Sequence, residues 1–210
     1  MQFLGRLDAG EQLSDHIKVN EPENTVVLGL PRGGIPLALI IAKNHGVSFD
    51  VVMAKKLVHP EHSEVAIGAM ADDSEPVISP QFTIEPDWIE SETLRVKNEN
   101  KQRRLLYDNV IEQQTLEGKD VILVDDGIAT GSTMFAAIRS VKARKPKNMT
   151  VAVPIIPKST YYALEKVVDN ICYVAVPSHF LGSVSAYYRN FPQITDEEIL
   201  DMLKSFQLNL

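Results

Sequence analysis

The sequence predicts an α/β fold in which a mostly parallel β-sheet carries helices on both faces. Short apolar runs alternate along the chain with longer amphipathic stretches, which is the pattern of strand–helix–strand units. The 210 residues are enough for one domain with a full core, and no internal repeat divides them. We therefore expect a single domain over residues 1–210, with an inserted flap at about residues 57–85 and a tail at about residues 178–210.

The expected strands are apolar runs bounded by turn-forming residues. The run NTVVLGL ends at Pro31 and the run VILVDD ends at Gly127, as buried strands of a parallel sheet often do. Residues 64–73 and 75–79 lie around a short turn and indicate an antiparallel flap. In chain order the expected strands are residues 24–30, 48–56, 64–73, 75–79, 121–126, 148–155 and 170–176.

The expected helices show apolar residues at helical spacing and recognisable ends. Pro36 fits the first turn of one helix, and Ser159 and Thr195 are the expected N-caps of two others. A charged stretch at about residues 87–114 lacks Gly and Pro and predicts a long solvated helix. Its partial apolar stripe would consist of Trp88, Leu94, Leu105, Leu106 and Val110. In chain order the expected helices are residues 35–45, 87–114, 132–144, 159–168 and 195–206.

Composition and charge disfavour several classes of protein. The formal net charge of −7 disfavours a non-specific nucleic-acid binder, so we expect no DNA partner. The longest apolar run, at residues 35–42, is far shorter than a membrane span, and the N-terminus does not read as a secretory signal. The single cysteine, Cys172, excludes an internal disulfide and favours a reducing, cytoplasmic location. No zinc-type ligand spacing occurs.

The stretch VILVDDGIATGST carries two adjacent acids, Asp125 and Asp126, to the end of a buried strand, where like charges repel and lose hydration. Ligands of parallel α/β sheets bind at these strand ends. Carboxylates can accept hydrogen bonds from a vicinal diol or hold Mg²⁺ through its water shell. The hydroxyl-rich loop that follows leads into a helix N-terminus and suits a phosphate. A ribose 5-phosphate would satisfy both features; a plain turn with Ser132 or Thr133 as a helix cap is the alternative.

A second candidate anion site follows the first expected strand, in the stretch GLPRGG. Gly33 and Gly34 would let the backbone approach a ligand closely, and Arg32 can fork onto phosphate oxygens. The alternative is a tight turn with a surface arginine. Two anion-binding loops at neighbouring strand ends would fit a substrate with phosphates at both ends of a ribose.

The stretch VILVDDGIATGST resembles the phosphoribosyl-pyrophosphate (PRPP) loop of the type I phosphoribosyltransferases. The resemblance implies that family's fold, with a hood built from the chain termini. It implies that Asp125 and Asp126 bind the ribose hydroxyls and hold Mg²⁺ through water, and that the loop with Arg32, Gly33 and Gly34 binds pyrophosphate. The PRPP-binding residues would be Asp125, Asp126, Gly127, Ala129, Thr130, Gly131, Ser132 and Thr133.

The resemblance also implies the reaction, in which a nitrogen acceptor such as a nucleobase displaces pyrophosphate from C1 of PRPP. Catalytic candidates are Lys55, Lys56 and Glu64, in or beside the flap; because side chains alternate along a strand, only one of the two lysines should point inward. His59 and His62 are either proton donors or ordinary surface histidines. Dimers are common in the family, so a homodimer is the expected assembly.

The acceptor is not defined by the motifs. Hypoxanthine–guanine enzymes of the family carry an aspartate at the position of Ala129, and its loss here weighs against that acceptor class. The chain is similar over nearly its whole length to a subgroup of predicted phosphoribosyltransferases with no settled acceptor. Aromatic residues in the tail would either stack on a flat base or pack together; they are Phe180, Tyr187, Tyr188 and Phe191.

Two further functions use the same pocket. The protein could be a non-catalytic regulator that senses PRPP or a nucleotide, since the fold also occurs in such proteins. It could instead hydrolyse a nucleotide monophosphate or a pyrophosphate. Pyrophosphate release that depends on an added base distinguishes transfer from both alternatives.

Overall fold

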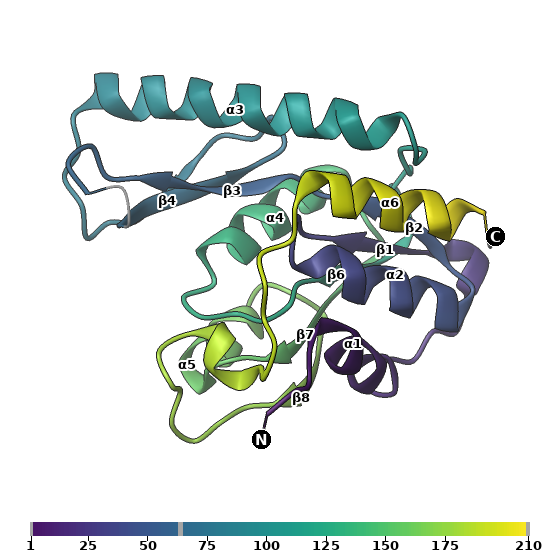
Figure 1. The fold of residues 1–210 in the computed structure, drawn as a ribbon. Helices are drawn as coiled ribbons and strands as arrows, with labels where there is room; N and C mark the ends of the chain where they lie inside the picture. Colours follow the sequence, from purple (N-terminus) through teal and green to yellow (C-terminus); the bar gives the residue numbers. More distant parts are fainter. Residues whose placement is uncertain (1, 63–64, 209–210) are drawn as a thin grey trace.

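The structure, a computed structural model, describes residues 2–62 and 65–208. A five-stranded parallel sheet has the order β2-β1-β6-β7-β8, and an antiparallel sheet of order β3-β4-β5 lies under the long helix α3 (Figure 1). The α/β class predicted from the sequence is therefore confirmed. The strands are β1 Thr25–Gly29, β2 Ser48–Val51, β3 Ala54–Val58, β4 Ala66–Ala71, β5 Val77–Ile78, β6 Asp120–Val124, β7 Asn148–Ile155 and β8 Asn170–Ala175. The helices are α1 Arg6–Ser14, α2 Gly34–His45, α3 Pro86–Asp108, α4 Ser132–Ala143, α5 Lys158–Leu164 and α6 Asp196–Gln207, with 3₁₀ turns η1 Pro22–Asn24 and η2 Val184–Tyr187.

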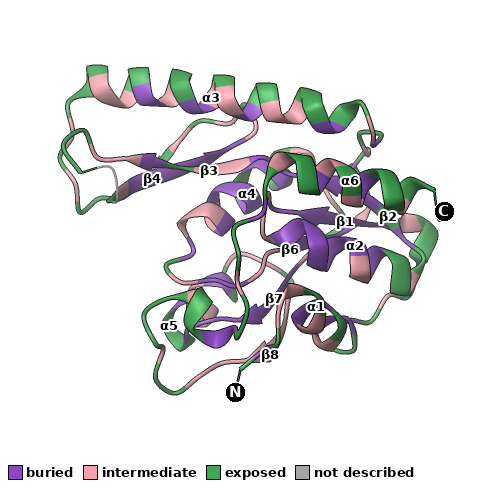
Figure 2. Ribbon diagram, viewed as in Figure 1, coloured by how far each residue is buried: buried purple, intermediate pink, exposed green. Residues whose placement is uncertain are grey.

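Helices cover both faces of the parallel sheet, as expected. α1, α2 and α6 contribute to one apolar core and α4 and α5 to a second. Alternate residues of β1 face the two cores: Val27 belongs to the first, and Val26 and Leu28 belong to the second. The strands of this sheet are mostly buried, while the outer side of α3 is exposed (Figure 2). Burial on both faces explains why these strands read as continuous apolar runs.

The order of the parallel sheet reverses between β1 and β6. From β1 the chain moves outward to β2, whereas from β6 it moves the other way to β7 and β8. In open α/β sheets the ligand crevice lies outside the carboxyl ends of the strands at such a reversal. The two loops singled out in the sequence follow β1 and β6, so the topology brings them together.

The single strand predicted at residues 48–56 is wrong, because it is two strands in two different sheets. Val52 donates to Gly29 O at the end of β2, and the chain then leaves the parallel sheet. Met53 N donates to the Asp72 carboxylate (3.0 Å), and Met53 O accepts from the Asn100 amide (3.3 Å). Side chains from distant segments thus satisfy the backbone where the strand breaks. No Gly or Pro marks the break in the sequence.

The long helix α3 buries a different stripe from the one predicted. Leu94, Leu105 and Leu106 are exposed, between 46% and 57% of each residue. The polar residues Glu92 and Asn100 are buried in their place, because Glu92 accepts a hydrogen bond from Val58 N and Asn100 donates to Met53 O. The buried residues of α3 are Glu92, Val96, Asn100 and Tyr107. α3 also ends at Asp108, short of the predicted residue 114.

Helix ends agree with the sequence in one case and differ in another. Thr195 caps α6 through a capping box with Glu198, as its sequence pattern predicts. Ser159, by contrast, is not the cap of α5, which begins at Lys158 after Pro157 and ends at Leu164 rather than at residue 168. The helix α1 was not predicted. Within the described residues, no helix is both long enough and apolar enough to cross a membrane.

Candidate active site at the carboxyl ends of β1 and β6

The loops after β1 and β6 lie in direct contact. A Cβ added to Gly34 would lie 2.4 Å from Val124 O, and one added to Gly33 would lie 1.9 Å from Asp126 Oδ2. Only a residue without a side chain fits at either position while the loops remain this close. The sequence-predicted glycines of the pyrophosphate loop therefore lie against the backbone and side chain of the predicted sugar site.

A cavity of about 180 Å³ opens at the end of β6. Its lining includes the acid Asp125, the lysine Lys56 and the side chain of Val184, which belongs to the C-terminal segment. Asp126, Arg32 and Lys55 are not in its lining. The predicted site residues that the cavity brings together are Lys56, Asp125, Gly127, Ala129, Thr130, Gly131, Ser132 and Thr133.

The loop between β6 and α4 is held open for an anion. Gly131 is the N-cap of α4 and makes no side-chain capping bond, so the first amides of α4 have no side-chain cap there. The Thr130 and Ser132 hydroxyls lie 3.4 Å apart beside it. Thr160 of α5 donates to Ala129 O (2.9 Å) and fixes the loop from outside. The backbone amides at the helix N-terminus, the hydroxyls and the helix dipole make this loop suitable for a phosphate.

The two acids have different surroundings. Asp125 faces the cavity and accepts a hydrogen bond from Asp126 N (2.8 Å). Burial and the neighbouring charge of Asp126 raise the pKa of Asp125 well above its ordinary value. Asp126 Oδ2 accepts from Arg6 Nε of α1 at 2.8 Å. Burial also raises the pKa of Asp126, although the charge of Arg6 opposes that rise.

The chain termini form the hood implied by the resemblance, and they reach the acids. Phe3 N donates to Tyr187 O (2.8 Å) and Arg189 N donates to Phe3 O (2.7 Å), so the N-terminal and C-terminal segments are paired. The Tyr188 hydroxyl donates to Asp126 O at 2.6 Å. No sequence motif predicts these contacts, because they join residues more than 60 positions apart.

The aromatic residues of the tail pack against one another. The Phe180 and Tyr187 rings stack with centroids 5.4 Å apart, and those of Tyr188 and Phe191 lie 4.6 Å apart. Tyr187 and Tyr188 are each only 5% exposed. These aromatic residues therefore pack together, which was one of the two alternatives, the other being to stack on a flat base. Neither buried tyrosine offers an open face to such a base.

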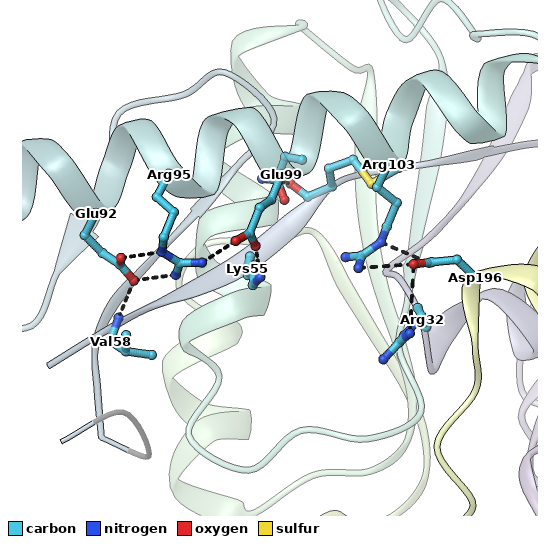
Figure 3. Close-up of polar contacts among 10 residues, drawn as sticks. Arg32, Lys55, Val58, Glu92, Arg95, Glu99, Arg103 and Asp196 are labelled. Atoms are coloured by element: carbon cyan, nitrogen blue, oxygen red, sulfur yellow. Dashed lines mark hydrogen bonds and ion pairs between the residues drawn. The ribbon is translucent and has the colours of Figure 1, made fainter.

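The two flap lysines point in different directions. Lys56 lines the cavity beside Asp125. Lys55 pairs with Glu99 of α3, which Arg95 also contacts, so Lys55 belongs to a chain of ion pairs beneath α3 (Figure 3). The alternation of side chains along β3 explains the difference. The sequence did not decide which of the two lysines points inward; in the structure it is Lys56 that lines the cavity.

The remaining flap candidates lie elsewhere. The rings of His59 and His62 stack on each other with centroids 5.2 Å apart, and neither residue lines the cavity. Glu64 lies outside the described residues. The structure therefore brings neither histidine to the acids at the end of β6.

Arg32 contacts an acid that the sequence analysis missed. Its Nη1 lies 3.9 Å from Asp196 Oδ2, in the first turn of α6 (Figure 3). The same carboxylate accepts from Arg103 Nε (3.0 Å) and from the Tyr107 hydroxyl (2.8 Å). Arg32 and Asp196 are about one-third exposed, so this contact is weak and open to exchange with another anion.

The donor set suits a magnesium ion. Asp125 and Asp126 are two partly buried carboxylates whose pKa values are raised, chiefly by burial. Mg²⁺ is usually bound by one or two carboxylates, with waters and substrate phosphates completing its shell. Among the described residues no group of three or more His, Cys, Asp or Glu side chains could hold a metal ion. The two carboxylates fit an ion whose remaining ligands are waters and substrate phosphates.

The fold and the site define an α/β protein with paired acids and a phosphate-type loop at the reversal of a parallel sheet. The family described as the phosphoribosyl transferase domain matches residues 7–183, so the chain belongs to that family. This agrees with the resemblance found in the sequence and with the enzyme class it implies. Phosphoribosyltransferases generally use Mg²⁺ together with PRPP.

Individual relatives agree with this family. Two proteins of Mycobacterium tuberculosis, from strains CDC 1551 and H37Rv, are 32% identical over 205 residues and carry phosphoribosyl transferase as a provisional name. The match covers 96% of this chain and 46% of each relative, so the chain spans less than half of their length. The crystal structure of the protein TT1426 from Thermus thermophilus is 33% identical, with a TM-score of 0.81, and the match covers 98% of this chain and 99% of that one.

Proposed function

We propose that this protein is a catalytic phosphoribosyltransferase, which binds PRPP and transfers its phosphoribosyl group to a nitrogen acceptor, a nucleobase in our hypothesis, with release of pyrophosphate. The observation that carries the proposal is the cavity at the end of β6, where Asp125 lies beside the uncapped N-terminus of α4. A carboxylate that accepts from sugar hydroxyls, next to amides and hydroxyls that bind a phosphate, is complementary to a ribose 5-phosphate.

The roles follow from the position of each group. Asp125 and Asp126 would accept hydrogen bonds from the ribose hydroxyls. Arg32 and the glycines beside it would bind the diphosphate, with Asp196 displaced from Arg32 by the more highly charged ligand. The 5-phosphate would be bound by Gly127, Ala129, Thr130, Gly131, Ser132 and Thr133.

In the transfer step the acceptor nitrogen forms a bond to C1 of the ribose and releases its N–H proton to solvent. The bond from C1 to the diphosphate oxygen breaks, and its electron pair leaves with pyrophosphate. Lys56 lies beside the cavity and would stabilise the departing negative charge, whereas Lys55 is occupied by Glu99. When bound, Mg²⁺ would be held by Asp125 and Asp126 through water and would neutralise charge on the diphosphate. We keep Glu64 as a candidate for contacting the acceptor.

The experiment that tests this function measures pyrophosphate release from PRPP and Mg²⁺ in the presence of a panel of nucleobases. Release that requires both a base and intact Asp125 supports transfer. Release from PRPP alone would indicate hydrolysis instead. If PRPP binds and a broad panel of bases yields no pyrophosphate, the proposal of a catalytic transferase is wrong.

A second candidate function is non-catalytic sensing of PRPP or a nucleotide. The observation that favours it is the packing of Tyr187 and Tyr188 within the hood, where each is 5% exposed and offers no open platform for a base. Binding of PRPP with Mg²⁺, without turnover of any base, would support this function.

We further propose that residues 1–210 form a single domain, that the protein acts as a homodimer in the cytoplasm, and that it has no DNA partner. The net charge of −7 and the single cysteine support the last two points. Sedimentation of the purified protein would establish whether it is a dimer.

A further inference from the structure

The side chain of Arg6 makes three contacts, one with Asp126 and two with the C-terminal segment. Its Nε donates to Asp126 Oδ2 at 2.8 Å, and its Nη1 donates to Pro192 O at 2.7 Å. Its guanidinium carbon lies 3.8 Å from the centroid of the Phe191 ring. The side chain is only 12% exposed. A guanidinium with this many partners has little freedom to turn away, so the orientation of Arg6 is fixed.

Asp126 is confined in turn by its neighbours. Its Oδ2 accepts from Arg6 and lies where a Cβ on Gly33 would be 1.9 Å away, so the pyrophosphate loop closes that side. The Tyr188 hydroxyl donates to Asp126 O and holds the backbone. A carboxylate has about four acceptor positions, so the contact with Arg6 leaves capacity for a sugar hydroxyl.

We propose that Arg6 is a positioning residue of the sugar site: it holds Asp126 through Oδ2 and so presents the rest of this carboxylate to one ribose hydroxyl, while Asp125 stays on the cavity. The inference rests on the function proposed above and extends it to a residue outside both loops. Arg6 also connects the two segments of the hood, the N-terminal helix and the C-terminal segment, to the acid that would bind the sugar.

The test compares the binding of PRPP with Mg²⁺ and of inorganic phosphate, which has no ribose, by wild type, Arg6→Gln and Arg6→Lys. Arg6→Gln should weaken PRPP binding by roughly tenfold or more, as loss of groups that orient site residues does. Its affinity for inorganic phosphate should stay close to that of wild type, because phosphate makes no contact with the sugar-binding acid. Arg6→Lys keeps the charge but not the fork, so it should weaken PRPP binding less than Arg6→Gln does.

The matched control is Arg139→Gln, which removes an exposed arginine of α4 and should leave both affinities unchanged. A merely structural role for Arg6 would weaken the binding of PRPP and of inorganic phosphate equally. Equal loss of that kind, or wild-type PRPP affinity in both Arg6 variants, would overturn the inference.

If Arg6→Gln does not fold, Arg6→Lys decides the matter by itself: weakened binding supports the inference and wild-type affinity overturns it. Circular dichroism of each variant identifies that case. Failure of the proposed function has a different signature, because wild type itself would then bind no PRPP, or would bind it and release no pyrophosphate with any base.

Discussion

At the scale of single residues, Asp125 and Asp126 are adjacent in the sequence but meet different partners. Asp125 has a raised pKa and faces a cavity, whereas Asp126 Oδ2 lies 2.8 Å from Nε of Arg6, a partly buried arginine. The negative charge of Asp125 is therefore unfavourable in the free protein, while that of Asp126 is partly compensated by Arg6. Neutral substitutions at the two positions should therefore change stability by different amounts.

Asp125→Asn should raise the free energy of unfolding by on the order of 1 kcal/mol at neutral pH, because it removes an unfavourable buried charge. The folded pKa of Asp125 is above the ordinary 3.8, so the unfolded chain releases this proton first as pH rises. The gain should thus be largest above the folded pKa and disappear as pH falls toward 3.8. Urea denaturation at several pH values measures it, and a gain that does not change with pH would contradict this explanation.

The same Asp125→Asn variant should lose PRPP binding in calorimetric titration. Asp126→Asn should lose binding as well but should gain less stability than Asp125→Asn, because it also removes the partner of Arg6. Equal stability changes in the two variants would show that Arg6 does not distinguish the acids.

Gly33→Ala tests the contact between the two loops. Gly33 has an ordinary helical backbone, with φ of −65°, so alanine adds no backbone strain there. Its Cβ would nevertheless lie 1.9 Å from Asp126 Oδ2 and must displace that carboxylate. We expect PRPP affinity to fall roughly tenfold or more. Gly5→Ala is the control, since its Cβ would meet its nearest neighbour at 3.6 Å; retention of full affinity by Gly33→Ala would contradict the described contact.

At the scale of elements, β3 separates two lysines that the sequence places side by side. Lys56→Ala should lower kcat/KM by about tenfold or more, because Lys56 lies at the cavity and would stabilise the negative charge of the departing pyrophosphate. Lys55→Ala should change kcat/KM by about twofold or less, since Lys55 and Glu99 form a pair that is about one-third exposed. Steady-state kinetics with the acceptor found in the base panel measures both. The reverse order of effects would mean that Lys55 reaches the substrate.

At the scale of the whole molecule, Asp72 ties the flap sheet to the parallel sheet. Its carboxylate accepts from Met53 N (3.0 Å), where the chain leaves the parallel sheet, and from the Ser140 hydroxyl of α4 (2.6 Å). Asp72→Ala should therefore lower the free energy of unfolding by about 2 kcal/mol, since both donors lose their partner. Chemical denaturation measures the loss. Asp73→Ala, at the exposed neighbouring position, should be close to neutral, and equal effects in the two variants would contradict this role.

Much of the fold and part of the candidate site could be predicted because their signals are local. The strand before Asp125, the hydroxyl-rich loop and the Thr195 cap each lie within a few consecutive residues. The break after β2 gave no such signal, because Val52 and Met53 continue an apolar run. The buried face of α3 gave no local signal either. Glu92 and Asn100 are buried there because they form hydrogen bonds with β3 and Met53, while leucines of the same helix face solvent.

The sequence by itself determined the α/β class, the two anion-type loops and the family resemblance, because apolar period and loop composition are properties of neighbouring residues. Only the tertiary structure decided that Lys56 rather than Lys55 lines the cavity and that Arg6 holds Asp126. Arg6 and Asp126 are 120 positions apart, and their contact depends on how the termini fold back over the sheet. Such a charge pair depends on tertiary packing, so it cannot be recognised from any single stretch of the sequence.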